Sequence, residues 1–152
     1  YQQRHQYGSQ LMKKDSDMNA SVAMQQYRQN HIQGGVETAS PHRLVQMLME
    51  GALEKILTAK MYMENKDIAK KGETISWAIS IIDGLRSCLN TQDGGDIAQE
   101  LFALYNYMEA RLLEANIKND QTMLDEVGLL LNQIKSGWDN IPAEFHNNTL
   151  EN

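Results

Sequence analysis

Several features that mark common protein classes are scarce or missing in this sequence of 152 residues. With a single cysteine, Cys88, the chain cannot form an internal disulfide, which excludes a disulfide-stapled scaffold and suits a reducing compartment. No run of about 18 consecutive apolar residues occurs, so a membrane-spanning helix is not expected. Residues 1–17 lack the apolar core of a secretion signal. These absences predict a cytoplasmic protein with no direct insertion into a membrane.

Positive charge is also in short supply. The chain has 14 Lys and Arg residues against 20 Asp and Glu residues, a formal net charge of −6. Nucleic-acid-binding domains usually present a basic patch or stripe. The pairs Lys13-Lys14 and Lys70-Lys71 are isolated, and their simplest interpretation is solvated surface. We therefore expect no nucleic-acid partner.

Motifs of catalysis and of metal binding are absent as well. The sequence contains neither HExxH nor CxxC, and no Glu-x-x-His pair that would build a di-iron site in a helix bundle. The four histidines are scattered, and His42 falls in the first turn of a predicted helix, where capping or solvent contact is the simplest interpretation. The chain is therefore predicted not to be an enzyme, with no catalytic, metal or cofactor site.

What the sequence has in quantity is helical periodicity. Between Ser40 and Trp138, four segments carry apolar residues at three- and four-residue spacing, which is typical of amphipathic helices. The expected inward positions are Leu44, Leu48, Ala52, Ile56, Ala59 and Met63, with Met47 and Tyr62 alongside; Ile68, Ile75, Ile79, Ile82, Leu85 and Leu89; Ile97, Leu101, Leu104, Met108, Leu112 and Ala115; and Leu124, Val127, Leu131, Ile134 and Trp138.

Each segment begins with a residue that can cap a helix. The expected starts are Ser40 followed by Pro41, Asp67, Asp96 with Gln99 completing a capping box, and Asn119 or Asp120. Because the connections between the segments are short, consecutive helices must run antiparallel. The sequence therefore predicts an all-α fold, an antiparallel up-down-up-down four-helix bundle with a short N-terminal cap helix.

The chain divides into three parts by composition. They are residues 1–17, which are polar and either disordered or added upstream of a start at Met18; the bundle with its cap segment, 18–142; and a flexible tail, 143–152. Within the second part, Met24 and Tyr27 give the short cap helix a small apolar face before Gly34-Gly35 interrupts it.

The helices carry more apolar residues than one inward stripe requires. The flanking positions are Val45, Met49, Leu53, Leu57 and Met61; Trp77, Ile81 and Cys88; and Phe102, Tyr105, Tyr107 and Leu113. One interpretation is a wide core face with singly exposed residues, which are normal. The other is an apolar groove that receives a partner segment in helical form, to which the nine methionines would adapt. The pattern leaves both open.

Four stretches resemble the family of flagellar secretion chaperones called FliS, in the family's order over residues 22–142. They are 39–48 (ASPHRLVQML) with 51–53, 71–73 with 81–86, 94–98 (GGDIA) with 104–108 (LYNYM), and 114–120 (EANIKND) with Trp138. The resemblance implies a cytoplasmic export chaperone that binds the disordered C-terminal region of flagellin and prevents its premature polymerisation. It also implies delivery of flagellin to the flagellar type III export gate.

The resemblance and the surplus apolar positions together suggest where a partner would bind. The candidate partner-binding residues are Met24, Tyr27, Ile75, Ile82, Leu89, Leu101, Tyr105, Met108 and Leu112, several of which can instead belong to the core. Tyr27 corresponds to the family's N-terminal tyrosine. A homodimer in the client-free state is left open. The alternative function is a generic helical adaptor or scaffold that binds another amphipathic partner helix.

Overall fold

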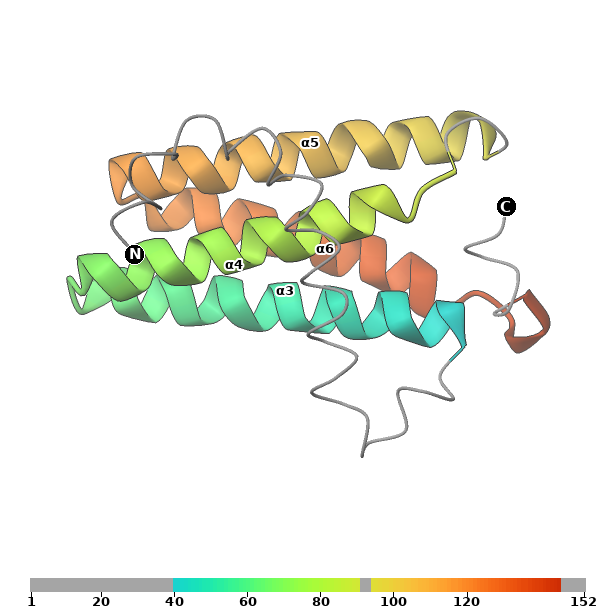
Figure 1. Ribbon diagram of the computed structural model, residues 1–152, viewed down its shortest axis with the longest axis horizontal. Helices are drawn as coiled ribbons and strands as arrows, with labels where there is room; N and C mark the ends of the chain where they lie inside the picture. Colours follow the sequence, from blue (N-terminus) through green and yellow to red (C-terminus); the bar gives the residue numbers. More distant parts are fainter. Residues whose placement is uncertain (1–39, 91–93, 146–152) are drawn as a thin grey trace, which may run out of the picture.

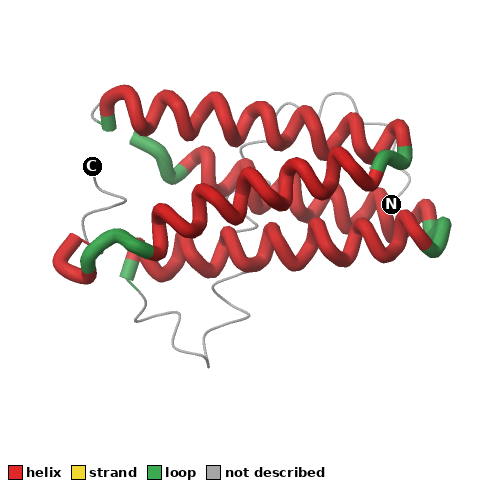
Figure 2. The backbone as a smooth tube through the Cα atoms, turned by 180° about the vertical axis from the view of Figure 1, so that it is seen from behind, coloured by secondary structure: helices red, strands yellow, loops and turns green. Residues whose placement is uncertain are grey.

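Four long helices make up most of the described chain. The computed structural model describes residues 40–90 and 94–145. The elements are α3 (Pro41–Glu64), α4 (Ile68–Ser87), α5 (Gly95–Lys118), α6 (Gln121–Asp139) and a 3-10 turn, η3 (Ala143–Phe145). Within these two stretches there is no strand (Figure 2). The predicted all-α class is confirmed.

The helices form a bundle in which each helix packs against two others. Helix α3 contacts α4 and α6, and α5 contacts the same two helices from the opposite side (Figure 1). Turns at residues 65–67 and 119–120 reverse the chain, so consecutive helices are antiparallel, as predicted. The expected cap helix, with Met24 and Tyr27, lies outside the described residues.

Three of the predicted helix starts are confirmed by side-chain caps. The capping bonds run from the Arg43 amide to Ser40 Oγ (3.1 Å), from the Lys70 amide to Asp67 Oδ1 (3.2 Å) and from the Thr122 amide to Asp120 Oδ1 (2.9 Å). Each bond satisfies a backbone donor that has no partner inside the helix. These caps fix where α3, α4 and α6 begin.

The predicted start of α5 is wrong by two residues. Gly94 is the N-cap and makes no capping side-chain bond, so Asp96 lies inside the first turn instead of capping it with Gln99. Gly95 has a φ of +64°, which a side chain would strain. A Cβ on Gly94 would lie 2.5 Å from the Asn90 carbonyl oxygen. The tight entry into α5 therefore depends on two glycines and not on a capping box.

The core follows most of the predicted stripes, but it also contains Val45, Met49, Ile81 and Tyr105, which were predicted to flank them. It contains Val45, Leu48, Met49, Ala52, Ile56, Ala59, Met63, Ile75, Ala78, Ile81, Ile82, Leu85, Tyr105, Met108, Leu112, Ala115, Met123, Leu124, Val127 and Leu131. Ile68 and Ile97, predicted to point inward, are instead 70% and 71% exposed. Both lie in the first turn of a helix, where the neighbouring helices no longer cover them.

A buried lysine closes the end of α5. Lys71 was predicted to be solvated, but its ammonium donates hydrogen bonds to the Asn116 carbonyl (3.0 Å) and to Asn119 Oδ1. Asn119 ends α5 in the left-handed conformation, with a φ of 52°. A cation at a helix C-terminus satisfies free carbonyls and opposes the negative end of the helix dipole. The prediction of a solvated Lys71 is therefore wrong.

Candidate functional site

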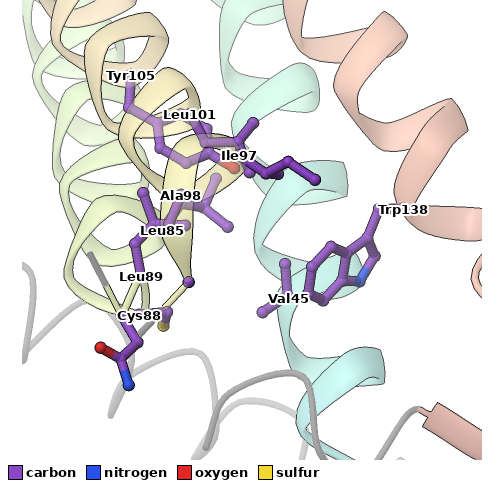
Figure 3. A pocket seen from close by; sticks show the side chains of 11 residues that line it. Val45, Leu85, Cys88, Leu89, Ile97, Ala98, Leu101, Tyr105 and Trp138 are labelled. Carbon is purple, nitrogen blue, oxygen red and sulfur yellow. The ribbon is translucent and has the colours of Figure 1, made fainter. Parts of the chain in front are cut away.

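An apolar pocket lies at one end of the bundle, where α3 and α5 begin and α4 and α6 end (Figure 3). Its volume is about 170 Å³. The lining residues are Val45, Leu85, Cys88, Leu89, Asn90, Gly94, Ile97, Ala98, Leu101, Tyr105 and Trp138. Trp138 faces Val45 on one side, and the α4 and α5 residues lie opposite (Figure 3). All four helices therefore contribute to one site.

The lining of the pocket carries no charged side chain. Burial raises the pKa of the Cys88 thiol. Burial, followed by the nearby Cys88, raises the pKa of the Tyr105 phenol, so both groups are neutral at physiological pH. A concave, uncharged site of this kind suits apolar side chains of a ligand and gives no counter-ion to a charged one.

Trp138 is held in the pocket wall by His42. The two rings stack with centroids 4.9 Å apart and an interplanar angle of 7°. The indole Nε1–H also donates a hydrogen bond to the His42 carbonyl at 3.0 Å. His42 is 1% exposed, so the prediction that it contacts solvent is wrong. The ring fills the joint between the start of α3 and the end of α6.

Polar side chains strengthen the same joint on its outer side. Asp139 accepts hydrogen bonds from Lys135 Nζ and from Gln46 Nε2, both at 2.7 Å. These bonds, led by the one from Lys135, hold the pKa of Asp139 below its usual range. Glu50 lies 3.2 Å from Arg43 and 3.7 Å from Lys135. The end of α6 is thus tied to the first three turns of α3.

A line of exposed apolar residues continues from the pocket along the outer face of α5. Phe102 follows the pocket residue Leu101, and Leu113 and Ile117 lie further along the helix. Their spacing of eleven and four residues places them on one side of a helix. We call Phe102, Leu113 and Ile117 the α5 stripe. Exposed apolar residues that share one side of a helix can contact the apolar face of a partner helix.

Polar residues of α4 and α5 occupy the middle of the stripe. Arg86 pairs with Asp83, donates to Asn106 and lies 3.4 Å from a Glu109 oxygen. Its guanidinium carbon is also 5.8 Å from the Phe102 ring centre. Burial, and next the Asp83 carboxylate, raise the pKa of Glu109 to about 7 against the opposing effect of Arg86. The Arg86 guanidinium therefore forms ion pairs with two carboxyl groups, those of Asp83 and Glu109.

The sequence-predicted partner residues divide into three groups. Leu89, Leu101 and Tyr105 line the pocket. Ile75, Ile82, Met108 and Leu112 lie in the core, each at most 1% exposed. Met24 and Tyr27 lie outside the described residues. The role of all nine in binding a partner stays a prediction.

Eight of the pocket residues were not among the predicted partner residues. Val45 and Cys88 were assigned to the flanks, and Leu85, Ile97 and Trp138 to the inward stripes; Asn90, Gly94 and Ala98 were assigned to neither. The eight lie in or near the helix ends that meet at one end of the bundle. The capping residues predict where each helix begins and ends, and the antiparallel order predicts which of these ends meet. The apolar residues within one or two turns of those ends could therefore have been singled out from the sequence.

A second hollow, of about 240 Å³, lies between α3 and α4 and is lined by Lys55, Tyr62, Lys70, Glu73, Thr74 and Trp77. Lys55 Nζ lies 4.8 Å from the Trp77 ring centre, and Lys70 Nζ lies 5.8 Å from that of Tyr62. This hollow is lined by charged side chains, unlike the pocket.

In residues 40–90 and 94–145, no set of three His, Cys, Asp or Glu side chains is placed to hold a metal. No described helix has the length and apolarity to cross a membrane.

Comparison with known proteins identifies a family. The model of the family described as "Flagellar protein FliS" matches residues 23–144. The flagellar secretion chaperone FliSB of Pseudomonas aeruginosa is 51% identical over 124 residues, which are 82% of this chain and 98% of that relative. The FliS chaperone of Vibrio cholerae is 46% identical, over 84% of this chain and 93% of the relative. That of Salmonella typhimurium is 41% identical, over 82% and 93%.

These matches confirm the resemblance drawn from the sequence. They cover the four helices and extend a short distance to either side. FliS chaperones are not enzymes, so the prediction of a non-enzymatic protein is confirmed too. The chain belongs to the FliS family of flagellar secretion chaperones.

Proposed function

We propose that this chaperone binds the disordered C-terminal region of flagellin in the cytoplasm, prevents premature polymerisation and delivers the client to the flagellar export gate. The observation that carries the proposal is the uncharged pocket, built by all four helices and continuous in sequence with the α5 stripe. An unfolded client exposes apolar side chains, and covering them needs surface and not catalysis.

The pocket is the anchor point in this proposal. Its volume of about 170 Å³ suits one or two apolar side chains of a client segment. Ordering a disordered client costs free energy, so a single anchor cannot give useful affinity. Further contacts must follow along the molecule.

The α5 stripe supplies those contacts. An amphipathic segment leaving the pocket would meet Phe102 and then Leu113 and Ile117. Between them, the Arg86 cluster offers hydrogen-bonding groups to the client backbone or its polar side chains. This arrangement matches recognition of a helix by apolar contacts at regular spacing.

The proposal assigns different parts to the predicted residues. Leu89 and Leu101 contact the client directly from the pocket wall, and Tyr105, which lines the pocket at 2% exposure, also belongs to the core. Ile75, Ile82, Met108 and Leu112 support this surface from inside and would touch the client only if α4 and α5 separated. Met24 and Tyr27 belong to the cap segment, which we propose covers the pocket in the free chain.

The test compares two isoleucines of similar exposure that lie at opposite ends of the bundle, one at the start of α4 and one at the start of α5. Ile97 lines the pocket at 71% exposure, whereas Ile68 is 70% exposed at the far end of the bundle. Ile97→Asp should weaken binding of the flagellin C-terminal region roughly tenfold or more in calorimetry. Ile68→Asp should retain most of the affinity. Equal affinities for the two variants would remove the pocket from the site.

The binding reaction should carry the signature of apolar burial. We expect one client per chaperone, a negative heat-capacity change and little dependence on salt. Leu113→Asp tests the stripe in the same assay, with Leu57→Asp, exposed on α3, as its control. If flagellin does not bind at tens of micromolar, the chain would instead be an adaptor for another amphipathic helix.

Delivery and self-association need separate measurements. Flagellin secretion by cells that carry Ile97→Asp should fall in proportion to the loss of client binding. Sedimentation of the free chain with and without client tests the homodimer, which the client should dissociate if it uses the same apolar surface.

A further inference from the structure

We propose that the hollow between α3 and α4 is a docking site for an acidic helical segment of a second protein, which binds while the client occupies the pocket. The hollow shares no lining residue with the pocket. It lies toward the end of α3 and the start of α4, whereas the pocket lies at the opposite ends of these helices. The α5 stripe is also remote from it, because α3 and α5 lie on opposite sides of the bundle (Figure 1).

Two pairs of a lysine and an aromatic ring form the ends of the hollow. Lys55 Nζ of α3 lies 4.8 Å from the centre of the Trp77 ring of α4, and Lys70 Nζ of α4 lies 5.8 Å from that of Tyr62 of α3. On each helix the lysine and the ring residue are seven positions apart, which is about 10 Å along the axis. Because α3 and α4 are antiparallel, the two ammonium groups lie at opposite ends of the hollow.

The two ammonium groups differ from most cations of the described chain, which form ion pairs with carboxylates. The paired cations are Arg43, Lys60, Arg86, Arg111, Lys118 and Lys135. Within residues 40–90 and 94–145, Lys55, Lys66 and Lys70 form no ion pair. The sequence has 20 acidic residues against 14 Lys and Arg residues, so unpaired lysines are the exception. Two of the three line this hollow.

The aromatic rings position these lysines without neutralising them. A ring face attracts an ammonium group through its quadrupole and leaves the positive charge in place. A lysine side chain that is already placed loses less rotamer freedom when it binds a carboxylate. Trp77 is itself 44% exposed, and tryptophan is among the residues that contribute most to binding at protein interfaces. The hollow therefore presents two ordered cations and an exposed aromatic ring.

The charges in the hollow define the chemistry of the partner. Carboxylates seven residues apart on a helix have the same spacing of about 10 Å, so they can reach Lys55 and Lys70 together. Glu73 lies between Lys70 and Trp77 in the sequence and lines the hollow, where it would repel a third carboxylate. It favours hydrogen-bond donors such as amide or hydroxyl side chains at that point. The partner is thus a helix with two Glu or Asp residues seven apart and uncharged polar residues between them.

An anionic membrane is the other source of negative charge, but the surroundings disfavour it. Surfaces that bind anionic lipids carry clusters of several Lys or Arg residues. Here Glu64, Asp67 and Glu73 are interspersed among the lysines of the same stretch. A flat anionic surface would meet these carboxylates as well, whereas a helix can place its charges selectively. The alternation of charge therefore favours a peptide segment.

The two tryptophans of the sequence provide one reporter for each site. Trp77 lines the hollow and Trp138 lines the pocket. Both are replaced by 5-fluorotryptophan in the full chain, and Trp77→Phe assigns the two fluorine NMR signals. The probe is a helical peptide with two Glu residues seven apart, separated by Gln and Ser. It should move the Trp77 signal alone, with a dissociation constant on the order of 0.1–1 mM. Raising the salt concentration from about 0.05 M to about 0.5 M should weaken it roughly fivefold or more.

Matched variants test the two lysines. Lys55→Glu and Lys70→Glu should each weaken binding of the acidic peptide roughly tenfold, because each places like charges together. Lys66→Glu is the control, since Lys66 is also unpaired and exposed but does not line the hollow, and it should retain the affinity within about twofold. The double variant Lys55→Glu, Lys70→Glu should bind a peptide that carries Lys at the two Glu positions. Circular dichroism checks that each variant is folded.

The outcomes separate this inference from the proposed function. A Trp77 signal that stays in place at about 1 mM acidic peptide, or moves equally with a peptide that has Gln for Glu, would overturn the docking site. Movement with vesicles of phosphatidylcholine and phosphatidylglycerol but not with the peptide would assign the hollow to a membrane instead. If the flagellin C-terminal region moves both signals, the hollow belongs to the client and the second partner is refuted. Binding of the acidic peptide, with no effect of flagellin on Trp138, would support the docking site and contradict the proposed function.

Discussion

At the scale of single residues, a few side chains at helix ends determine how the bundle is closed. Gly94 allows the tight entry into α5, Lys71 donates hydrogen bonds at the C-terminal end of α5, and Asn119 ends that helix in the left-handed conformation. The apolar stripes do not specify any of these contacts. Their effects are local, so each can be measured against a neighbour that lacks the connection.

Gly94→Ala should destabilise the chain by roughly 1–3 kcal/mol, because its Cβ would lie 2.5 Å from the Asn90 carbonyl and 2.6 Å from Ala98 Cβ. Gly137→Ala in α6 is the matched control, since nothing lies within 4 Å of its Cβ position. That variant should be neutral or more stable by up to about 1 kcal/mol. Urea unfolding of both variants measures the difference, and equal stability would refute the steric argument.

Lys71→Met should cost roughly 1–3 kcal/mol, because the Asn116 carbonyl and the Asn119 side chain would lose their buried donor. The adjacent Lys70 is exposed, and Lys70→Met should stay within about 0.5 kcal/mol. Thermal melts of the two variants would decide between a structural and a solvated role for Lys71.

At the scale of helices, local sequence signals predicted most of the architecture. The polar caps Ser40, Asp67 and Asp120 located three helix starts, because capping is a contact between near neighbours in the sequence. The start of α5 was placed wrongly because it depends on the φ of Gly95 and on crowding around Gly94, which no side-chain pattern reveals.

The pocket was predictable only in part. Leu89, Leu101 and Tyr105 were named because they lie on the predicted apolar faces of two helices. Ile97 and Trp138 were assigned to the core, since periodicity shows which side of a helix is apolar but not where the neighbouring helix ends. The pocket can be recognised only when the relative positions of the four helix ends in space are known.

The contact between α4 and α5 should show a pH dependence that runs against the usual behaviour of acidic groups. The pKa of Glu109 is raised from 4.5 to about 7, so its contribution to stability is complete below pH 4.5 and is lost as the pH rises through 7. Between pH 5 and 8, the urea midpoint of the wild type should fall relative to that of Glu109→Gln. Parallel curves would show that the Glu109 carboxyl titrates normally.

At the scale of the whole molecule, stability comes from a core shared by all four helices. Leu131 is fully buried in that core, so Leu131→Ala should cost roughly 2–5 kcal/mol. Leu129, two residues earlier and 61% exposed, provides the control and should change stability by less than about 0.5 kcal/mol. Leu104 is half-buried, and Leu104→Ala should fall between them. Denaturant melts with unchanged slopes would make the three values comparable.

The bundle and the N-terminal segment are expected to have different roles in client binding. If the segment with Met24 and Tyr27 covers the pocket in the free chain, it competes with flagellin, and the apparent affinity is lowered by the fraction of covered molecules. Deleting residues 1–33 should therefore leave the helical content of α3 to α6 intact and tighten flagellin binding. Deleting residues 1–17 alone should leave the affinity unchanged. Calorimetry on the two truncated chains decides, since equal affinities for both would mean that the segment leaves the client site free.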